Sequence, residues 1–233
     1  MRPEPTDPVT AERRALWSLL TSREALIIAV GLVLLVLQYY HRSLGLVHWR
    51  HATVEAHAVT VICLFVVPAL IAMLALRASP AQMGLGWGQP RIWTRYLAVY
   101  AAVTIPVVVV ASRVNAFRVY YPMYDAALVN HALVPVSIAS FGVYFFAWEF
   151  FFRGFLLFGL EPRFGAYAIL MQTVPFVLAH LGKPEPEVYG ATIAGLALGL
   201  MAYRGRCIWP CFFLHWGVAT LLDLLIIFWP TGP

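Results

Sequence analysis

Residues 133–160, LVPVSIASFGVYFFAWEFFFRGFLLFGL, decide the fold of this chain. The stretch is almost entirely apolar and exceeds the roughly 20 residues that a helix needs to cross the hydrocarbon core of a bilayer. Only Glu149 and Arg153 interrupt it with charge. Because backbone groups in lipid must find their hydrogen bonds within the protein, the stretch predicts a membrane-spanning α-helix.

The composition of the whole chain leads to the same conclusion. Of 233 residues, 61% are hydrophobic and 12% are charged, whereas soluble domains average roughly 45–50% and about 25%. The net charge of +5 comes from basic residues scattered between apolar runs, so no basic stripe indicates nucleic-acid binding. Cys63, Cys207 and Cys211 form neither a CxxC pair nor an even set, which argues against a disulfide framework or a zinc knuckle.

The fold class that we predict is all-α, a polytopic membrane helix bundle with about seven transmembrane helices. The predicted spans are seven apolar stretches, at 25–40, 58–76, 96–111, 133–160, 166–181, 188–203 and 208–228. The predicted organisation has four parts: a cytoplasmic N-terminal segment (1–24), three N-terminal transmembrane helices with their loops (25–132), a helical core (133–228) and a tail (229–233).

The distribution of Lys and Arg predicts the orientation, because positively charged loops stay in the cytoplasm. With the N-terminus inside, ten basic residues fall on the inner side and five on the outer side. The segment QYYHRS after the first span lacks the small-residue site of a cleaved signal peptide, so that span is interpreted as an uncleaved anchor. We expect a multi-pass protein of the bacterial cytoplasmic membrane with its N-terminus inside.

Ionisable residues within the predicted spans mark a candidate site. Each costs about 2.5–3.5 kcal/mol at the centre of a helix on insertion scales, and such residues usually pair or face a cavity. The first three spans contain no charged residue between their ends. The ionisable residues within spans all lie in the second half of the chain: Glu149, Arg153, His180, His215 and Asp223.

These residue types suit the activation of water. Glu149 and Arg153 are four residues apart, so they share one helix face and can pair. At about 1.5 Å per residue, Glu149 and His180 lie at similar depths on consecutive spans, and His215 reaches the same cavity if its helix boundary shifts by one turn. A carboxylate can take a proton from water, and an imidazole can donate one or stabilise an oxyanion. An internal ion pair that only fixes helix packing is the alternative.

No cofactor is predicted, with zinc left open. Glu149, His180 and His215 are of the residue types that ligate zinc, but the chain has no HExxH motif and the three residues lie on separate spans. The segment HWRHATVEAH (48–57) is interpreted as a juxtamembrane polar stretch rather than as a metal site.

The order and spacing of these residues resemble the CAAX prenyl protease and bacteriocin-processing family, the Abi-type glutamic intramembrane proteases. The family pattern is EExxxR on one membrane helix, FxxxH on the next and HxxxN on a later one. This chain has WExxxR at 148–153, FxxxH at 176–180 and HxxxA at 215–219. The resemblance covers about residues 133–228, and each motif is weakly specific until the three are taken in order.

The resemblance implies an intramembrane endopeptidase whose catalytic part is the 133–228 core. In this reading Glu149 and His180 activate the water that attacks a peptide bond, and His215 stabilises the oxyanion. Arg153, Phe176 and Asp223 are expected to support them. The expected partners are a membrane-associated protein or peptide substrate and the lipid bilayer, without nucleic acid.

Two departures from the family pattern leave an alternative open. Trp148 stands where the family has its first glutamate, and Ala219 stands where it has asparagine. Neighbouring residues on an α-helix point about 100° apart, so the side chain of Glu149 does not point in the direction of the first family glutamate. The alternative is a non-catalytic relative that binds a lipid, peptide or partner protein in the same cavity. Glu185 and Glu187, just after His180, are further candidate acids, although a solvated outer loop is the favoured interpretation.

Overall fold

The computed structural model describes residues 8–40 and 54–229. Every secondary-structure element in these two ranges is helical, so the predicted all-α class is confirmed. The segments long and apolar enough to cross a membrane are Arg23–Tyr40, His57–Ala75, Pro90–Ala111, His131–Phe164 and Trp209–Phe228.

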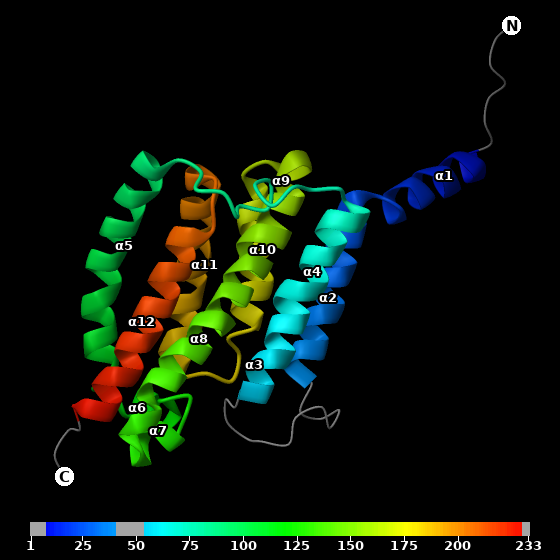
Figure 1. Cartoon of the computed structure of the whole chain (residues 1–233). Helices are drawn as coiled ribbons and strands as arrows, with labels where there is room; N and C mark the ends of the chain where they lie inside the picture. The colour runs from blue at the N-terminus through cyan, green and yellow to red at the C-terminus, as the bar shows by residue number, and fades with distance from the viewer. Residues whose placement is uncertain (1–7, 41–53, 230–233) are drawn as a thin grey trace, which may run out of the picture.

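Two further helices lie at the positions of the remaining predicted spans. Helix α10 (Tyr167–Leu178) is a shorter apolar helix, and α11 (Glu185–Gly205) has 21 residues with two acidic residues in its first turn. Both run alongside the longer segments (Figure 1). The structure is therefore the polytopic helical bundle that the sequence predicts. Its orientation in the membrane stays a prediction.

Each of the apolar segments that are long enough to cross a membrane consists of one or more helices. The first is α2 (Arg23–Tyr40) and the third is α5 (Pro90–Ala111). The second joins α3 (Val54–Val61), the π-helix η1 (Ile62–Val66), α4 (Val67–Leu70) and the π-helix η2 (Ile71–Ala75). The fourth joins a 3-10 turn η3 (His131–Leu133), α8 (Val134–Glu149), the π-helix η4 (Phe150–Leu157) and α9 (Phe158–Phe164). The last is α12 (Trp209–Phe228).

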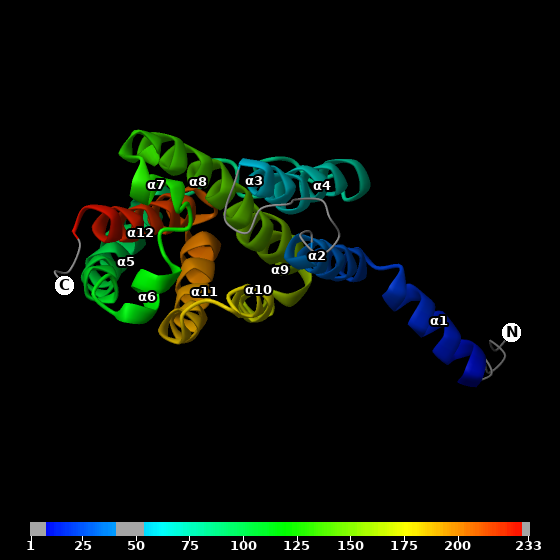
Figure 2. The ribbon, with the colours of Figure 1, turned by 90° about the horizontal axis from the view of Figure 1, so that it is seen from below.

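Three short helices lie outside this bundle. Helix α1 (Pro8–Leu20) projects sideways from the start of α2, while α6 (Asn115–Tyr120) and α7 (Ala126–Val129) both lie at the opposite end of the bundle (Figure 1). Seen from that end, the long helix α8–η4–α9 runs between α2 with α3–α4 on one side and α5, α11 and α12 on the other (Figure 2). The middle of the long helix is thereby surrounded by protein.

The packing around η4 forms the core of the bundle. All eight residues of η4 are buried, including four phenylalanines and Arg153. A π-helix carries i→i+5 hydrogen bonds, and such segments are frequent at functional sites. Here the π-helix begins directly after Glu149, which places the irregular backbone beside the charged residues.

A loop at the upper end of Figure 1 fixes the start of α12. The backbone N–H of Ile208 donates to Gly84 O at 2.9 Å, and the backbone N–H of Gln89 donates to Gly205 O at 2.7 Å. The indole N–H of Trp209 donates to Leu85 O at 3.1 Å. These bonds tie residues 84–89 to the α11–α12 turn, and so they set the depth at which α12 carries His215.

Helices α10 and α11 approach closely through small residues. A Cβ on Gly195 would lie 2.8 Å from Thr173 Cγ2, and one on Gly199 would lie 2.7 Å from Gln172 Nε2. Gln172 Nε2 also donates to Gly195 O at 2.9 Å. The spacing of small residues along α11 therefore permits this contact, as is common for membrane helices.

Replacing Gly195 by alanine is expected to destabilise the bundle. The added methyl meets the branched Thr173 side chain, and such overpacking costs about 1–3 kcal/mol. Gly190 lies on the same helix with open space around its Cβ position, so Gly190→Ala is the matched control and is expected to be neutral or stabilising. Thermal unfolding in detergent checks both variants, and equal midpoints would contradict the close contact.

Candidate active site

Glu149 and Arg153 form a buried ion pair at the junction of α8 and η4. Both residues are 0% exposed, and Arg153 Nη1 lies 3.1 Å from Glu149 Oε2 and 3.2 Å from Oε1. An isolated charge at this depth would carry a large desolvation cost, so each residue requires the other. The pairing that the four-residue spacing predicts is confirmed.

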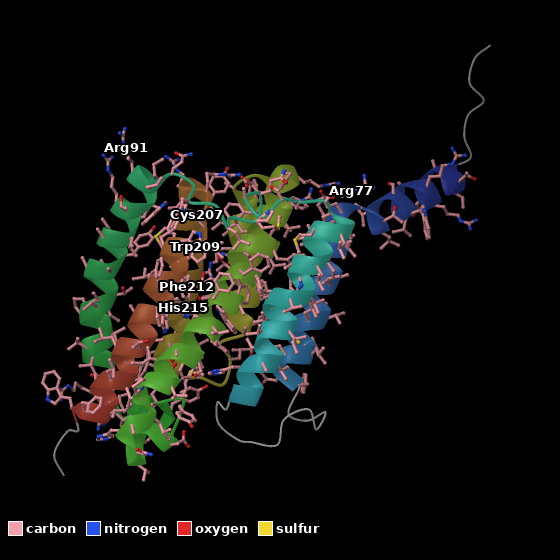
Figure 3. All side chains as sticks on the ribbon, in the orientation of Figure 1. Arg77, Arg91, Cys207, Trp209, Phe212 and His215 are labelled. Carbon is pink, nitrogen blue, oxygen red and sulfur yellow. The ribbon has the colours of Figure 1, made fainter. Side chains whose placement is uncertain are left out.

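His215 completes this group from α12. Its Nδ1 lies 2.6 Å from Glu149 Oε1, and its side chain is 14% exposed while that of Glu149 is 0% exposed. Figure 3 shows His215 well inside the bundle, about midway along α12 and far from Arg77 and Arg91 at the upper end. The structure thus brings together two helices through a carboxylate and an imidazole that are 66 residues apart.

The contact with Glu149 fixes the protonation pattern of His215. A carboxylate oxygen accepts, so His215 Nδ1–H donates, and the other ring nitrogen, Nε2, is directed away from this bond. The charges of Glu149 and Arg153 cancel, which leaves a neutral group when His215 is neutral. If His215 takes up a second proton, the carboxylate next to it offsets the new positive charge.

His180 lies in the same region but has a different partner. It follows α10 in a turn, is 4% exposed, and its Nδ1 lies 2.7 Å from the backbone oxygen of Phe176. Because that carbonyl only accepts, Nδ1 carries the proton and Nε2 is the free acceptor. Among the described contacts, none joins His180 to Glu149. The sequence paired Glu149 with His180, whereas in the structure it pairs with His215.

Trp148 accounts for this difference. Its ring lies edge-on to His180, with centroids 5.7 Å apart, and stacks on Tyr144 at 5.7 Å. The Trp148 side chain thus occupies the space on the His180 side of the long helix. Glu149, one residue further along, points toward α12, as the 100° rotation between helical neighbours requires.

Aromatic rings close the site on the other sides. Phe176 lies under the Arg153 guanidinium at 4.3 Å, a cation–π contact that partly replaces the lost hydration. Phe176 is also 6.2 Å from the His215 ring, and Phe145 is 4.4 Å from it. The supporting position predicted for Phe176 therefore agrees with where its ring lies, while its role stays a prediction.

Asp223 does not join this group. It lies two turns further along α12, in a separate cavity lined by Ser137, Ala219 and Thr220 among others. Its Oδ1 is buried and makes no hydrogen bond to the described protein atoms. No contact of the described residues therefore supports a direct role of Asp223 beside Glu149.

The interpretation of Glu187 as a solvated loop residue was wrong. Glu187 lies in the first turn of α11, accepts from the Tyr121 hydroxyl at 2.7–2.8 Å and pairs with Lys183 at 2.7 Å. Burial and the neighbouring carboxylate raise the pKa of Tyr121 well above its ordinary value. Sequence reasoning missed Tyr121, because no local pattern signals a partner 66 residues away.

No group of three or more His, Cys, Asp or Glu residues in the described ranges is arranged to hold a metal ion. Glu149 and His215 supply the two donor side chains that meet at the site. Of the juxtamembrane stretch 48–57, His48 and His51 fall outside the described residues. His57 is buried against Phe141 and Tyr144, at 4.8 and 5.2 Å.

A polytopic helical membrane protein with a Glu–Arg–His group inside its bundle is the class that this fold and site define. Residues 130–221 match the family model for Rce1-like proteins, described as type II CAAX prenyl endopeptidase Rce1-like. The match contains all three motifs and confirms the resemblance. The matched segment is similar to CAAX protease-type membrane endopeptidases. Neither a curated protein nor a solved structure matches the chain.

Removal of the Arg153 charge is expected to destabilise the protein strongly. Arg153→Met leaves Glu149 buried without its counter-charge, which costs about 3–5 kcal/mol, whereas removing both charges in Glu149→Gln/Arg153→Met recovers part of that loss. The control is Arg163→Met, which breaks an exposed pair with Glu24 and costs at most about 1 kcal/mol. Thermal unfolding measures all three. A double variant less stable than Arg153→Met would contradict the charge-pair explanation.

Proposed function

We propose that the protein is an intramembrane endopeptidase in which Glu149 and His215 act as one unit to activate water. The observation that carries this proposal is the 2.6 Å contact between Glu149 Oε1 and His215 Nδ1 inside the bundle. A carboxylate that holds one imidazole nitrogen leaves the other nitrogen available as a general base. Arg153 Nη1 lies 3.1 Å from Glu149 Oε2 and balances its charge.

The proposed reaction follows from this geometry. His215 Nε2 takes a proton from a water molecule, and the water oxygen attacks the carbonyl carbon of the scissile peptide bond. The resulting imidazolium is stabilised by Glu149, and it then gives its proton to the leaving amine as the C–N bond breaks. The products are a carboxylic acid and an amine, and His215 returns to its neutral form.

His180 is proposed to act at the same water, as an acceptor. Its Nδ1 is held by the Phe176 backbone oxygen at 2.7 Å, so Nε2 is left as the acceptor. The sequence assigned His180 as the partner of Glu149 and His215 as the oxyanion group. The observed contacts favour the reverse assignment for the glutamate, with His215 as its partner.

The proposed substrate is a membrane-associated protein or peptide. Glu149 and Arg153 are fully buried between helices that are apolar enough to lie in a bilayer, and phenylalanine rings surround them. A peptide bond that reaches this depth belongs to a chain already held at the membrane. Prenylated CAAX proteins, bacteriocin precursors and sorting-signal tails are all substrates of this kind.

Substitution of either member of the unit is expected to abolish cleavage. Glu149→Gln and His215→Ala should each lower the rate at least about 100-fold, since a positioned general base contributes about 10²–10⁴. His180→Ala should also lower it. The measurement compares the termini of membrane proteins in cells that express the wild type or each variant. Glu161→Gln, which changes a carboxylate at the exposed pair with Arg206, is the control and should keep full cleavage.

Folding of the variants is checked by thermal unfolding in detergent. If Glu149→Gln unfolds, the charge-balanced Glu149→Gln/Arg153→Met variant replaces it. Folded variants of both Glu149 and His215 that cleave like the wild type would overturn the proposed unit.

One observation favours the second candidate, a non-catalytic relative that binds a lipid, peptide or partner protein in the cavity. Trp148 takes the place of a glutamate and packs edge-on against His180, so His180 faces an indole ring where the family pattern provides a carboxylate. The methyl group of Ala219 provides no amide donor for an oxyanion, a loss that typically costs about 2.7–4 kcal/mol.

Restoring both family residues separates the two candidates. If the protein is non-catalytic, Trp148→Glu/Ala219→Asn should create cleavage that the wild type lacks, because it supplies a carboxylate beside His180 and an amide beside His215. The same comparison of membrane-protein termini measures it, with Trp148→Gln/Ala219→Asn as the control that adds no carboxylate. Cleavage by the wild type, lost in Glu149→Gln, eliminates this candidate.

A further inference from the structure

A small cavity with a mostly apolar lining begins one helical turn beyond His215, between α12 and α8. Its volume is about 20 Å³, and its lining includes Asp223, Thr220 and Ala219 from α12 and Ser137 and Phe141 from α8. Neither Glu149 nor His215 lines it. The cavity is therefore distinct from the Glu149–His215 unit.

The chemistry of the lining fits water. A cavity needs roughly 10–15 Å³ and two to four polar partners to hold one water molecule, and this cavity satisfies the first condition. The polar side chains are one carboxylate and two hydroxyls, from Asp223, Ser137 and Thr220. Asp223 Oδ1 is buried without a hydrogen-bond partner among the described protein atoms. A buried carboxylate oxygen left unpaired is costly, and a bound water donor removes that cost.

The position of the cavity links it to His215. Ala219 lies four residues after His215 and four before Asp223, so at about 1.5 Å per residue it is one turn, or about 6 Å, from each. Ala219 lines the cavity and packs against Phe141, Phe145 and Phe212, so a larger side chain at this position would fill the space between the cavity and His215.

We propose that this cavity binds an internal water held by Asp223, and that it is the staging site from which water reaches His215. The water site itself stands on the cavity, whereas its use in hydrolysis rests on the proposed function. Water must cross apolar protein to reach a hydrolytic site within a membrane. Asp223 places a carboxylate two turns, or about 12 Å, from the reacting imidazole, and the small Ala219 side chain lies between them on α12.

Hydroxyl-radical labelling by X-ray radiolysis tests the water site without any need for activity. Bound water generates radicals that oxidise adjacent rings, so Phe141, which lines the cavity, should be labelled several-fold faster than Phe158. The two rings are 5% and 4% exposed, and Phe158 does not line the cavity. Labelling of Phe141 at the rate of Phe158 in the wild type would overturn the proposal.

Four variants test whether the water is bound beside Asp223 and Ala219. Ala219→Leu fills the cavity and Asp223→Leu removes its carboxylate, so both should lower Phe141 labelling to the level of Phe158. Asp223→Asn keeps a polar side chain, and Val218→Leu changes volume on the neighbouring position, so both should keep the labelling. Unchanged Phe158 labelling shows that each variant is folded. Equal Phe141 labelling in all four would overturn the role of Asp223 and Ala219.

The hydrolytic role has a separate readout. Ala219→Leu should lower kcat about tenfold with KM unchanged, because it obstructs water and leaves substrate binding intact, while Val218→Leu should change neither constant. If Phe141 is labelled as expected but Glu149→Gln cleaves normally, the proposed function fails and the water site stands. If Glu149→Gln abolishes cleavage but Ala219→Leu leaves kcat unchanged, the staging role fails alone.

Discussion

The ion pair between Glu149 and Arg153 is the constraint on which the rest of the structure depends. Both side chains are fully buried in a helix long enough to span a bilayer, and neither charge is tolerable there alone. The four-residue spacing supplies the partner from the same helix, so the pair forms without help from other elements. The remaining helices must then enclose a polar group in an apolar surrounding, and the phenylalanines of η4 and α10 do so.

Much of the fold was predictable because the bilayer limits the possibilities. Only helices satisfy the backbone within lipid, so apolar length alone located the spans, and all seven predicted stretches lie on helices. The candidate residues were also identifiable, since charge inside a span is conspicuous. Their predictable contacts are those between residues close in the chain: Glu149 and Arg153 lie one turn apart, and His180 follows Phe176 by one turn.

The pairings between residues of different helices could not be predicted. The sequence indicates the depth of each residue along its helix, but not the direction in which its side chain points. Glu149, His180 and His215 are all compatible with one level, and only the rotation of each helix decides which of them meet. The π-helix that follows Glu149 shifts that rotation, and nothing in FFFRGFLL signals it. Asp223 and Glu187 show the same limit: their neighbours Ser137 and Tyr121 come from segments far away in the chain.

The two departures from the family pattern, Trp148 and Ala219, can be understood together from the directions in which the side chains of α8 and α12 point. Trp148 fills the space beside His180, which leaves Glu149, at the second position of the family pair, as the only carboxylate of the motif, and this carboxylate points toward α12. There it meets His215 at 2.6 Å, on the helix whose next turn carries Ala219. Ala219 packs there against Phe141, Phe145 and Phe212, and Phe145 in turn contacts the His215 ring at 4.4 Å. Both departures from the family pattern therefore lie next to the surroundings of one imidazole, that of His215.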